Sequence, residues 1–418
     1  MINSSAQVLE YTQAKLDYEN KKQQENQPQR PARKLRIAIV TETWPPEING
    51  VSLSVMQLTK GLQRRGHKIL LVRPQQSEKN HSFYPDQECV VRSQSIPKYP
   101  QMQFGWPQIF KIGQALDQFK ADIVHIVTEG PLGLAALNQA KLRNIPISSG
   151  FHSSFHDFSR YFDMAFLVRP VRQYLKWFHN QTDLTLVPSE DTRQVLKDEF
   201  GLRCPMRIIS RGVDNQRFNR NLRSSGLRRQ WQVDDNTTVL LSVGRVSPEK
   251  EVPFIIKSFY ALKKHQPQRK LKMVVVGDGP IREDLEKQYP DVVFMGAQMG
   301  EALAMCYASA DAFLFASEVD TFGNVVLEAV SSGLPVLAYN YAAPALMVEH
   351  ERTGWLLPFG DKEAWQKTLL KLPSLKDLAH MGQIASQKVG DCGWDRPVAD
   401  FEDALLHYAK KPTMYLQF

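Results

Sequence analysis

The chain has 418 residues, which is too long for one ordinary hydrophobic core, so two domains are expected. Its 43% hydrophobic and 23% charged residues are typical of a globular protein, and no apolar run is long enough to cross a bilayer. The formal net charge of +8 favours an anionic partner. Nucleic acid is the weakest candidate, because no zinc-finger spacing, RRM-like aromatic motif or basic-region heptad is present.

The N-terminal 33 residues are rich in Gln, Asn and Lys, a composition that predicts a mobile tail. The opening stretch MINSSAQVLEYTQAKL lacks a signal-peptide pattern. The cysteines are scattered without a CxxC pair, which indicates free thiols in a reducing cytoplasm and neither a disulfide framework nor a zinc site. They are Cys89, Cys204, Cys306 and Cys392.

Strands and helices are predicted to alternate from residue 35 onward. LRIAIV (35–40) is a continuous apolar run, typical of a strand buried on both faces. Helical spacing follows in VSLSVMQLTKGLQRRG, and further helices are expected near 107–119 and after PLG. This βαβ rhythm predicts a parallel, doubly wound sheet. The strands expected after the first are HKILLVRP, ADIVHIV, IPISSG and DLTLVPS.

The rhythm restarts with TTVLLSVGR (237–245) and continues through the apolar runs LKMVVVGDGP, DVVFMGA, AFLFAS and PVLAYN. The predicted fold class is α/β, with two Rossmann-like doubly wound domains facing across a cleft, where the carboxyl ends of both sheets would bind ligands. The expected domains are residues 34–200 and 201–393. The amphipathic segment 394–418 is expected to form a helix that returns to the first domain.

The strongest local signal is GRVSPEK, Gly244 to Lys250, directly after a predicted strand. A Gly at the strand end, followed by Arg245 and Lys250 across a tight loop, would place two cations at the carboxyl edge of the sheet. Arg supplies a fork of donors and Lys a point charge, as a pyrophosphate requires. The alternative is a pair of solvated surface charges, which is the usual fate of Lys and Arg.

The segment VVVGDGPIRE (274–283) predicts a strand that runs into Gly277, Asp278 and Gly279. It resembles a nucleotide-binding turn, but Arg282 stands where GxGxxG has its third glycine. A plain strand-to-helix turn explains the segment equally well. The departure counts against a nicotinamide dehydrogenase.

The segment SEVDTFGNVVLEAVSSG (317–333) places two acids, Asp320 and Glu328, around a turn and a helix start, with seven residues between them. The free backbone N–H groups of Phe322, Gly323 and Asn324 would donate hydrogen bonds to an anion. Glu328 would then accept hydrogen bonds from two ribose hydroxyls. Asp320 would contact the hydroxyls of the transferred sugar. The alternative is a capping acid followed by a buried, paired Glu.

The first domain offers two matching features. TETWPPEINGVSLS (41–54) places Gly50 at the start of a helix, where backbone amides can approach a phosphate or sugar. In FHSSFHDF (151–158), His152 follows a short strand and would point into the cleft. A lone His is more often structural, and the nearby His156 leaves open which of the two takes part.

In this order, these motifs resemble the retaining glycosyltransferases of family four over about residues 34 to 400. TETWPPEINGV and DTFGNVVLEA are most similar to the branch of glycolipid mannosyl- and glucosyltransferases, which includes relatives of the phosphatidylinositol mannosyltransferases and sulfoquinovosyl-diacylglycerol synthases. The resemblance implies a GT-B fold with the active site between its two domains. Family members usually have Glu at the first acid, whereas this chain has Asp320, which keeps the carboxylate and shortens its reach.

The resemblance also implies roles for these residues. Catalysis would fall to His152, Asp320, Arg245 and Lys250. The donor diphosphate would be held by Arg245 and Lys250, with the ribose on Glu328. The remaining donor-binding positions are Gly50, Gly244, Gly277, Asp278, Phe322, Gly323 and Asn324. No Asp-x-Asp is present in the sequence, so a metal-independent reaction with no cofactor besides the nucleotide-sugar substrate is expected.

The acceptor is predicted from DMAFLVRPVRQYLKWFHN (163–180), which mixes aromatic residues with Arg169, Arg172 and Lys176. Such a helix suits the surface of an anionic membrane, so a lipid acceptor and a peripheral location on the inner face of the cell membrane are expected. The alternative is a core-facing helix with a solvated basic edge. The resemblance to that branch alone implies GDP-mannose as the preferred donor, with mannose as the transferred sugar. A UDP-glucose-type transferase with a soluble or polysaccharide acceptor and a nucleotide-sugar epimerase are the competing functions.

Overall fold

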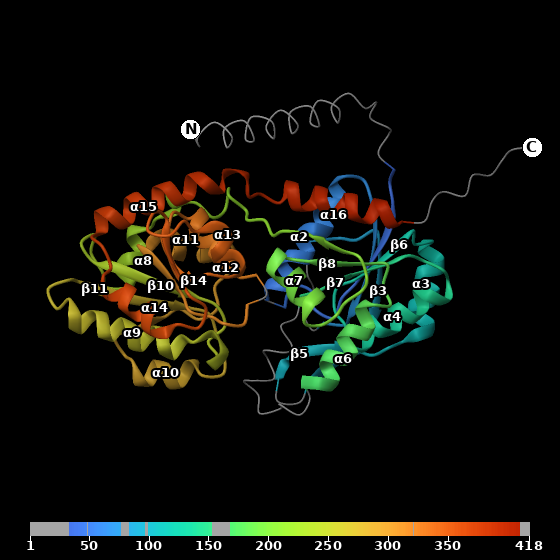
Figure 1. The fold of residues 1–418 in the computed structure, drawn as a ribbon, viewed down its shortest axis with the longest axis horizontal. Coiled ribbons are helices and arrows are strands. Elements are labelled where there is room, and N and C mark those ends of the chain that lie inside the picture. Colours follow the sequence, from blue (N-terminus) through green and yellow to red (C-terminus); the bar gives the residue numbers. More distant parts are fainter. Residues whose placement is uncertain are drawn as a thin grey trace, which may run out of the picture. The chain divides into compact units, whose positions relative to one another are not determined.

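The computed structural model describes residues 33–47, 49–76, 83–96, 99–152, 168–320 and 322–409. Leu35–Phe418 forms one compact unit. Residues 1–32, for which a mobile tail was expected, lie outside the described residues. The unit contains two parallel sheets, each flanked by helices (Figure 1).

The first sheet has seven parallel strands in the order β3-β2-β1-β6-β7-β8-β9. At its centre, Ile37 of β1 is in register with Ile69 of β2 and with Ile123 of β6. The strand order reverses between β1 and β6, which makes their carboxyl ends the expected ligand edge. The strands are β1 (Arg36–Val40), β2 (Lys68–Pro74), β3 (Gln87–Val91), β6 (Ile123–Ile126), β7 (Ile147–Gly150), β8 (Leu184–Val187) and β9 (Met206–Ile208).

Helices cover both faces of the first sheet, because successive strand side chains point to opposite sides. Ile37 and Ile39 enter a core with helices α2 and α16, whereas Ala38 and Val40 enter a second core with α3 and α4. A separate antiparallel pair, β4 (Ser93–Ile96) and β5 (Tyr99–Gly105), lies beside this sheet's helices. The helices are α2 (Gly50–Arg64), α3 (Ile109–Phe119), α4 (Pro131–Leu142), α6 (Val168–His179), α7 (Glu190–Asp198) and α16 (Asp395–Tyr408).

One expected boundary differs from that observed, and one expected helix is described only in part. Strand β9 continues the first sheet beyond residue 200, where the first domain was expected to end. In the predicted helix 163–180, residues 163–167 lie outside the described residues, and α6 begins at Val168 with Pro170 in its first turn. Proline is well tolerated there, because the first helical N–H groups have no partner within the helix.

The second sheet has six parallel strands in the order β12-β11-β10-β13-β14-β15. Its order reverses between β10 and β13, so these two strands define its ligand edge. The strands are β10 (Thr238–Val243), β11 (Leu271–Val276), β12 (Val293–Phe294), β13 (Ala312–Phe315), β14 (Val336–Tyr339) and β15 (Gly354–Leu357). Two parallel Rossmann-like domains, the fold class expected from the sequence, are thereby confirmed.

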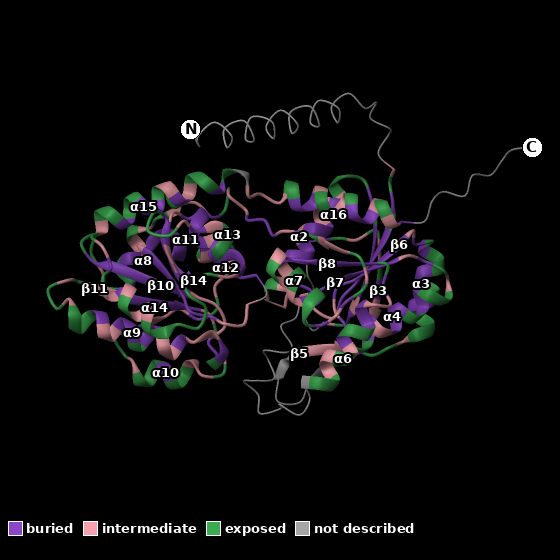
Figure 2. Cartoon of the chain, viewed as in Figure 1, coloured by how far each residue is buried: buried purple, intermediate pink, exposed green. Residues whose placement is uncertain are grey.

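The second sheet is also buried on both faces, as Figure 2 shows for the strands of both sheets. Leu240 and Leu314 pack with α9 and α14, whereas Leu241 and Phe313 pack with α11, α12 and α15. The helices are α8 (Ser225–Gln230), α9 (Val252–His265), α10 (Arg282–Gln288), α11 (Gly300–Ser309), α12 (Asn324–Ser331), α13 (Ala342–Met347), α14 (Lys362–Leu370) and α15 (Leu375–Lys388).

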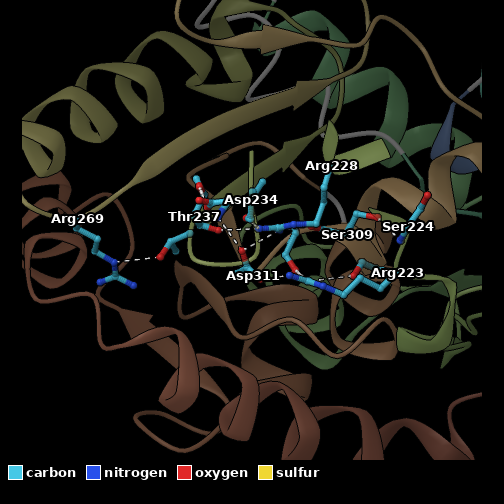
Figure 3. A network of polar contacts seen from close by, with 12 residues as sticks. Arg223, Ser224, Arg228, Asp234, Thr237, Arg269, Ser309 and Asp311 are labelled. Atoms are coloured by element: carbon cyan, nitrogen blue, oxygen red, sulfur yellow. Dashed lines mark hydrogen bonds and ion pairs between the residues drawn. The ribbon is translucent and has the colours of Figure 1, made fainter. Parts of the chain in front are cut away.

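A polar network lies at the amino ends of β10 and β13 (Figure 3). Arg228, only 2% exposed, donates to the carbonyl oxygens of Ser309 and Thr237, both at 2.8 Å. Asp311 accepts from the backbone N–H of Val239 at 2.8 Å and pairs with Arg228 at 3.3 Å. Because its charges are matched by these contacts, this edge is a structural one, opposite the edge where a ligand is expected.

Within the described ranges, no helix combines the length and apolar character needed to span a membrane.

Candidate active site

The loop after β10 forms the first part of the site. Gly244 has φ 151°, and a Cβ built on it would meet no atom within 4 Å, so the backbone here faces open space. Gly244, Arg245 and Lys250 line a pocket together with Phe315 and Ser317 at the end of β13. The two predicted cations therefore lie at the ligand edge of the second sheet, where a bound anion would find them.

Lys250 and Asp320 are brought together in this pocket region. Lys250 Nζ lies 2.9 Å from Asp320 Oδ2, and the two side chains are 24% and 21% exposed. Lys250 ends a short 3₁₀ turn, Pro248–Lys250, while Asp320 follows β13. A cation predicted for a diphosphate thus lies beside a carboxylate predicted for a sugar.

Gly277 and Asp278 shape the edge rather than line the pocket. A Cβ on Gly277 would lie 1.8 Å from the carbonyl oxygen of Gly244, and one on Gly279 would lie 2.2 Å from that of Val246. Asp278 accepts from the backbone N–H of Gly279 at 2.8 Å, so its carboxylate caps its own turn. These glycines let the loops after β10 and β11 pack backbone against backbone, as a strand-to-helix turn requires.

Helix α12 begins at Asn324, after Gly323 in the left-handed region with φ 89°. Phe322 is 6% exposed and packs in the core, which anchors the loop before the helix. The backbone N–H groups of the first turn have no partner within the helix, so they suit an anion. The side chain of Asn324 donates to Ser54 Oγ at 2.9 Å and to the carbonyl oxygen of Gly50 at 3.3 Å.

Gly50 opens helix α2, capped by Asn49, whose side chain accepts from the N–H of Ser52 at 2.8 Å. A Cβ on Gly50 would lie 3.5 Å from Asn324 Nδ2. Gly50, from the first-sheet part of the chain, and Asn324, from the second, therefore meet in one place, although 274 residues separate them.

Glu328 lies one turn into α12, half-buried, and accepts a hydrogen bond from the Tyr307 hydroxyl at 2.9 Å. Burial raises the pKa of Glu328 to about 7, against the opposing effects of the Tyr307 hydrogen bond and the Arg217 charge. Burial, with the adjacent Glu328 charge, also raises the pKa of Tyr307 well above its usual range. The paired Glu that the alternative interpretation described is therefore present. The ribose role expected for Glu328 stays a prediction, for which the carboxylate can accept further hydrogen bonds.

His152 follows β7 and makes a hydrogen bond through Nδ1 with Arg211 Nη2 at 2.8 Å. A Cβ on Gly150 would lie 2.3 Å from His152 Nε2, so the ring folds back over that glycine. Burial, followed by the charge of Arg211, lowers the pKa of His152 well below its usual range. His156, the other candidate histidine, lies outside the described residues.

Sequence reasoning missed Arg211, which follows β9 in SRGVD. Its signal was a charged residue directly after a strand, but β9 spans only three residues and carries no long apolar run. The residue lay beyond residue 200, where the first domain was expected to end. Arg211 is 9% exposed, and burial lowers its pKa to about 10.

An acidic pair was also missed at the ligand edge of the first sheet. Glu42 follows β1 and accepts from the N–H of Leu132 at 2.8 Å, and Glu129, 4% exposed, follows β6. His179 Nε2 lies 3.1 Å from a Glu129 carboxylate oxygen. Burial raises the pKa of Glu42 to about 7, and the Glu129 charge adds to the rise. Both acids follow strands, which is the signal that could have identified them.

One face of helix α6 packs into the core. Phe178 is fully buried and Leu175 is 3% exposed, whereas Trp177 is 46% exposed. Arg169 and Lys176 are exposed, and Arg172 lies over the ring of Phe200 at 4.8 Å. The described part of α6 therefore has a solvated basic edge with one exposed aromatic ring. The surface predicted to contact a membrane is limited there to Arg169, Lys176 and Trp177.

Two known families match the two halves of the chain. Residues 48–217 match the family described as Glycosyltransferase Family 4, and residues 237–374 match Glycosyl transferases group 1. The first match spans β2 to β9 of the first sheet, and the second spans all of the second sheet.

Similar proteins agree with these matches. The GDP-mannose-dependent alpha-mannosyltransferase of Mycobacterium tuberculosis (strain CDC 1551 / Oshkosh) is 34% identical over 335 residues, 79% of this chain and 85% of that protein. The alpha-monoglucosyldiacylglycerol synthase of Streptococcus pneumoniae (strain ATCC BAA-255 / R6) is 30% identical over 321 residues, 73% and 71% of the two chains. The fold is similar to that of sucrose-phosphate synthase from Thermosynechococcus elongatus, with TM-score 0.73, 18% identity and coverage of 90% and 99%. The chain belongs to glycosyltransferase family 4 and is a glycosyltransferase.

Proposed function

We propose that the chain is a retaining hexosyltransferase that moves mannose from GDP-mannose to a membrane lipid or glycolipid. The observation that carries this proposal is the 2.9 Å ion pair of Lys250 and Asp320 at the ligand edge of the second sheet. In a nucleotide sugar one bond joins diphosphate to hexose. A cation that binds the diphosphate and a carboxylate that binds the hexose must therefore be neighbours, as Lys250 and Asp320 are.

The transfer breaks the bond between the anomeric carbon and a phosphate oxygen and forms one from that carbon to an acceptor hydroxyl oxygen. The hydroxyl proton leaves with the departing diphosphate. With retention, the acceptor bonds from the face that the diphosphate leaves. Arg245 and Lys250 stabilise the charge that develops on the diphosphate, and we propose no metal ion or cofactor for this step.

The donor is proposed from several contacts. Glu328 would accept ribose hydroxyls, and Asp320 would contact the hexose after releasing Lys250 to the diphosphate. The helix start at Phe322, Gly323 and Asn324 would hold phosphate and sugar through backbone N–H groups. GDP-mannose is preferred because the mycobacterial relative is named for that donor.

The lipid acceptor is proposed from the surface charge of the chain and from the names of similar proteins. The streptococcal relative is named for a diacylglycerol product, and the chain carries a net charge of +8. Exposed Arg169, Lys176 and Trp177 on α6 suit an anionic membrane surface, where basic groups meet headgroups and an aromatic ring inserts. We place the protein on the inner face of the cell membrane, as a peripheral protein.

A UDP-glucose donor is the second candidate, because the streptococcal relative is named for a glucosyl product. Donor and acceptor are tested together by incubating the purified chain with GDP-, UDP-, ADP- and dTDP-sugars, each with and without a bacterial lipid extract. The proposal predicts lipid-dependent release of GDP from GDP-mannose. Lipid-dependent release of UDP would favour the second candidate. Equal rates of nucleotide release with and without the lipid extract would contradict a lipid acceptor.

A further inference from the structure

Arg211 is a buried cation with an unusual set of neighbours. It is 9% exposed, and among the described residues it forms no ion pair with a carboxylate. To a described residue, Arg211 donates from Nη2 to His152 Nδ1 at 2.8 Å. An arginine held away from water without a counter-charge costs free energy, so its place beside His152 needs a functional reason.

The hydrogen bond decides which nitrogen of His152 carries the proton. A guanidinium is a donor only, so His152 Nδ1 must accept, and the ring proton must lie on Nε2. A protonated imidazole has no acceptor to offer Arg211, and two like charges would then lie 2.8 Å apart. The pair is therefore compatible only with a neutral ring in the Nε2–H tautomer.

The surrounding groups add to the same effect. His152 and Arg211 line a pocket with His125 and with apolar side chains of α2, β8 and α16. Burial lowers the pKa of His152 most, and among the described residues the charges of Arg211, His125 and His179 lower it further. His125 is 3% exposed, bonds Ser148 Oγ at 2.9 Å, and has its pKa lowered to about 3 by burial and by Arg211.

The position of the ring is fixed as well as its charge. His152 follows β7 and Arg211 follows β9, so two strands of one sheet hold the two partners. Gly150 leaves the space that the ring fills, since a Cβ there would lie 2.3 Å from Nε2. A ring placed this way has few alternative orientations.

We propose that Arg211 is a positioning residue for sugar transfer, holding His152 as a neutral ring that meets the donor sugar through its Nε2–H. This inference rests on the proposed function and on the catalytic role that the family resemblance implies for His152. In this role His152 donates a hydrogen bond and neither takes nor gives a proton during the reaction. Arg211 acts through His152 and does not touch the substrate.

The tautomer is measured directly by nuclear magnetic resonance on the full chain labelled with ¹⁵N-histidine. A long-range ¹H–¹⁵N correlation detects both ring nitrogens, and the His152 signals are those lost in His152→Asn. We expect a protonated Nε2 and an unprotonated Nδ1, unchanged from about pH 6 to about pH 8, across the usual histidine range. An imidazolium, or a proton on Nδ1, would overturn the proposal.

Variants of Arg211 then test the cause. In Arg211→Met, His152 should lose its single tautomer, and kcat should fall by up to about 100-fold with little change in donor KM, as for a displaced reactive group. Arg211→Lys keeps a charged donor and should restore most of the tautomer signal and part of kcat. Arg207→Met is the matched control, because Arg207 lies on β9 in a surface ion pair with Asp403.

The control should change neither the His152 signals nor kcat. If Arg211→Met does not fold, Arg211→Lys and the wild-type spectrum still decide the matter. An unchanged tautomer in a folded Arg211→Met would overturn the role of Arg211. The spectra need neither donor nor acceptor, so they stand even if the panel of nucleotide sugars fails to show transfer, and the two failures are distinguishable.

Discussion

Glu328 is the residue whose proposed role depends most on pH. Its pKa of about 7 means that the half-buried carboxyl gains its charge within the physiological range. A ribose is held best by the charged form, which accepts two hydroxyl hydrogen bonds. Donor affinity should therefore rise as the pH increases through about 7 and level off above it, which titration calorimetry at several pH values would measure.

The contribution of Glu328 to folding stability depends on pH in the opposite direction to its contribution to donor affinity. Because the folded pKa of Glu328 lies above the ordinary value of 4.5, the stability that this group contributes is full below about pH 4.5 and is lost as the pH rises through about 7. Tighter donor binding at high pH thus cannot come from a more stable protein. Glu328→Gln should lose the pH dependence. Glu42→Gln, which removes the other carboxyl with a pKa of about 7, should keep it.

Lys250 gives the second prediction at this scale. Its ammonium contacts Asp320 at 2.9 Å, and it should transfer to the diphosphate when donor binds. Lys250→Ala should weaken donor binding by about 1.5–3 kcal/mol, the usual contribution of a hydrogen bond to a charged group. Lys263→Ala, which removes a surface partner of Asp291, should leave donor affinity unchanged. Equal affinities in wild type and Lys250→Ala would contradict the diphosphate assignment.

At the scale of elements, the loops after β10 and β11 depend on glycine. Gly277 has φ 141°, and its Cα approaches the carbonyl oxygen of Gly244 so closely that a Cβ would lie 1.8 Å away. Gly277→Ala should therefore push the β10 loop out of place and destabilise the protein by about 1–3 kcal/mol. Donor affinity should fall with it, as measured by denaturant unfolding and calorimetry on the same sample.

Gly226→Ala is the control, because Gly226 lies in α8 and a Cβ there would contact nothing closer than 3.6 Å. That variant should have the stability of the wild type or better, since alanine is favoured in a helix. A Gly277→Ala protein with unchanged stability and affinity would show that the two loops are not packed as described.

The strands that the sequence predicted well are the central ones. β1, β6, β10 and β13 are short continuous apolar runs, because both of their faces are buried. In the two parallel sheets, the strands that it missed, β3, β9 and β15, all lie at sheet edges, and it also missed the separate pair β4 and β5. β9 reads MRI and is half-exposed, so it needs no apolar run and leaves no pattern to find.

The residues of the candidate site also divide into those that the sequence pattern could predict and those that it could not. Arg245, Lys250 and Glu328 could be predicted as candidates because each lies in a distinctive segment of the chain beside a predicted strand or helix. Their pairing was not predictable, since Lys250 and Asp320 are 70 residues apart and meet only through sheet topology. Arg211 could not be placed, because its partner His152 lies 59 residues away on another strand.

At the scale of the whole molecule, the last helix ties the C-terminal end of the chain to the first sheet. Glu402 of α16 accepts from Arg65 at 2.6 Å and bonds His67 at 2.7 Å, and His67 is 1% exposed. Burial alone would raise the pKa of Glu402, but hydrogen bonds from His67 and Arg65 outweigh it and keep the pKa below its usual value. These contacts join α16 to residues that directly follow α2.

Glu402→Ala should destabilise the protein by about 1–3 kcal/mol, because it leaves the buried His67 without its partner. Asp403→Ala is the matched control on the same helix, since its partner Arg207 and the carboxylate itself are 38% and 76% exposed. Exposed pairs contribute little, so thermal unfolding should show a lower Tm for Glu402→Ala alone. Equal losses in both variants would contradict a specific tie through His67.

The central claim is that this glycosyltransferase moves a hexose from a nucleotide sugar to a lipid with retention, and the lipid product tests it most directly. The purified chain would be incubated with GDP-[¹³C]mannose and vesicles of bacterial lipid, and the organic phase analysed by nuclear magnetic resonance. We predict labelled mannose on a lipid, with the anomeric configuration that it had in the donor. Label confined to the aqueous phase, or a lipid product with the opposite configuration, would contradict the account.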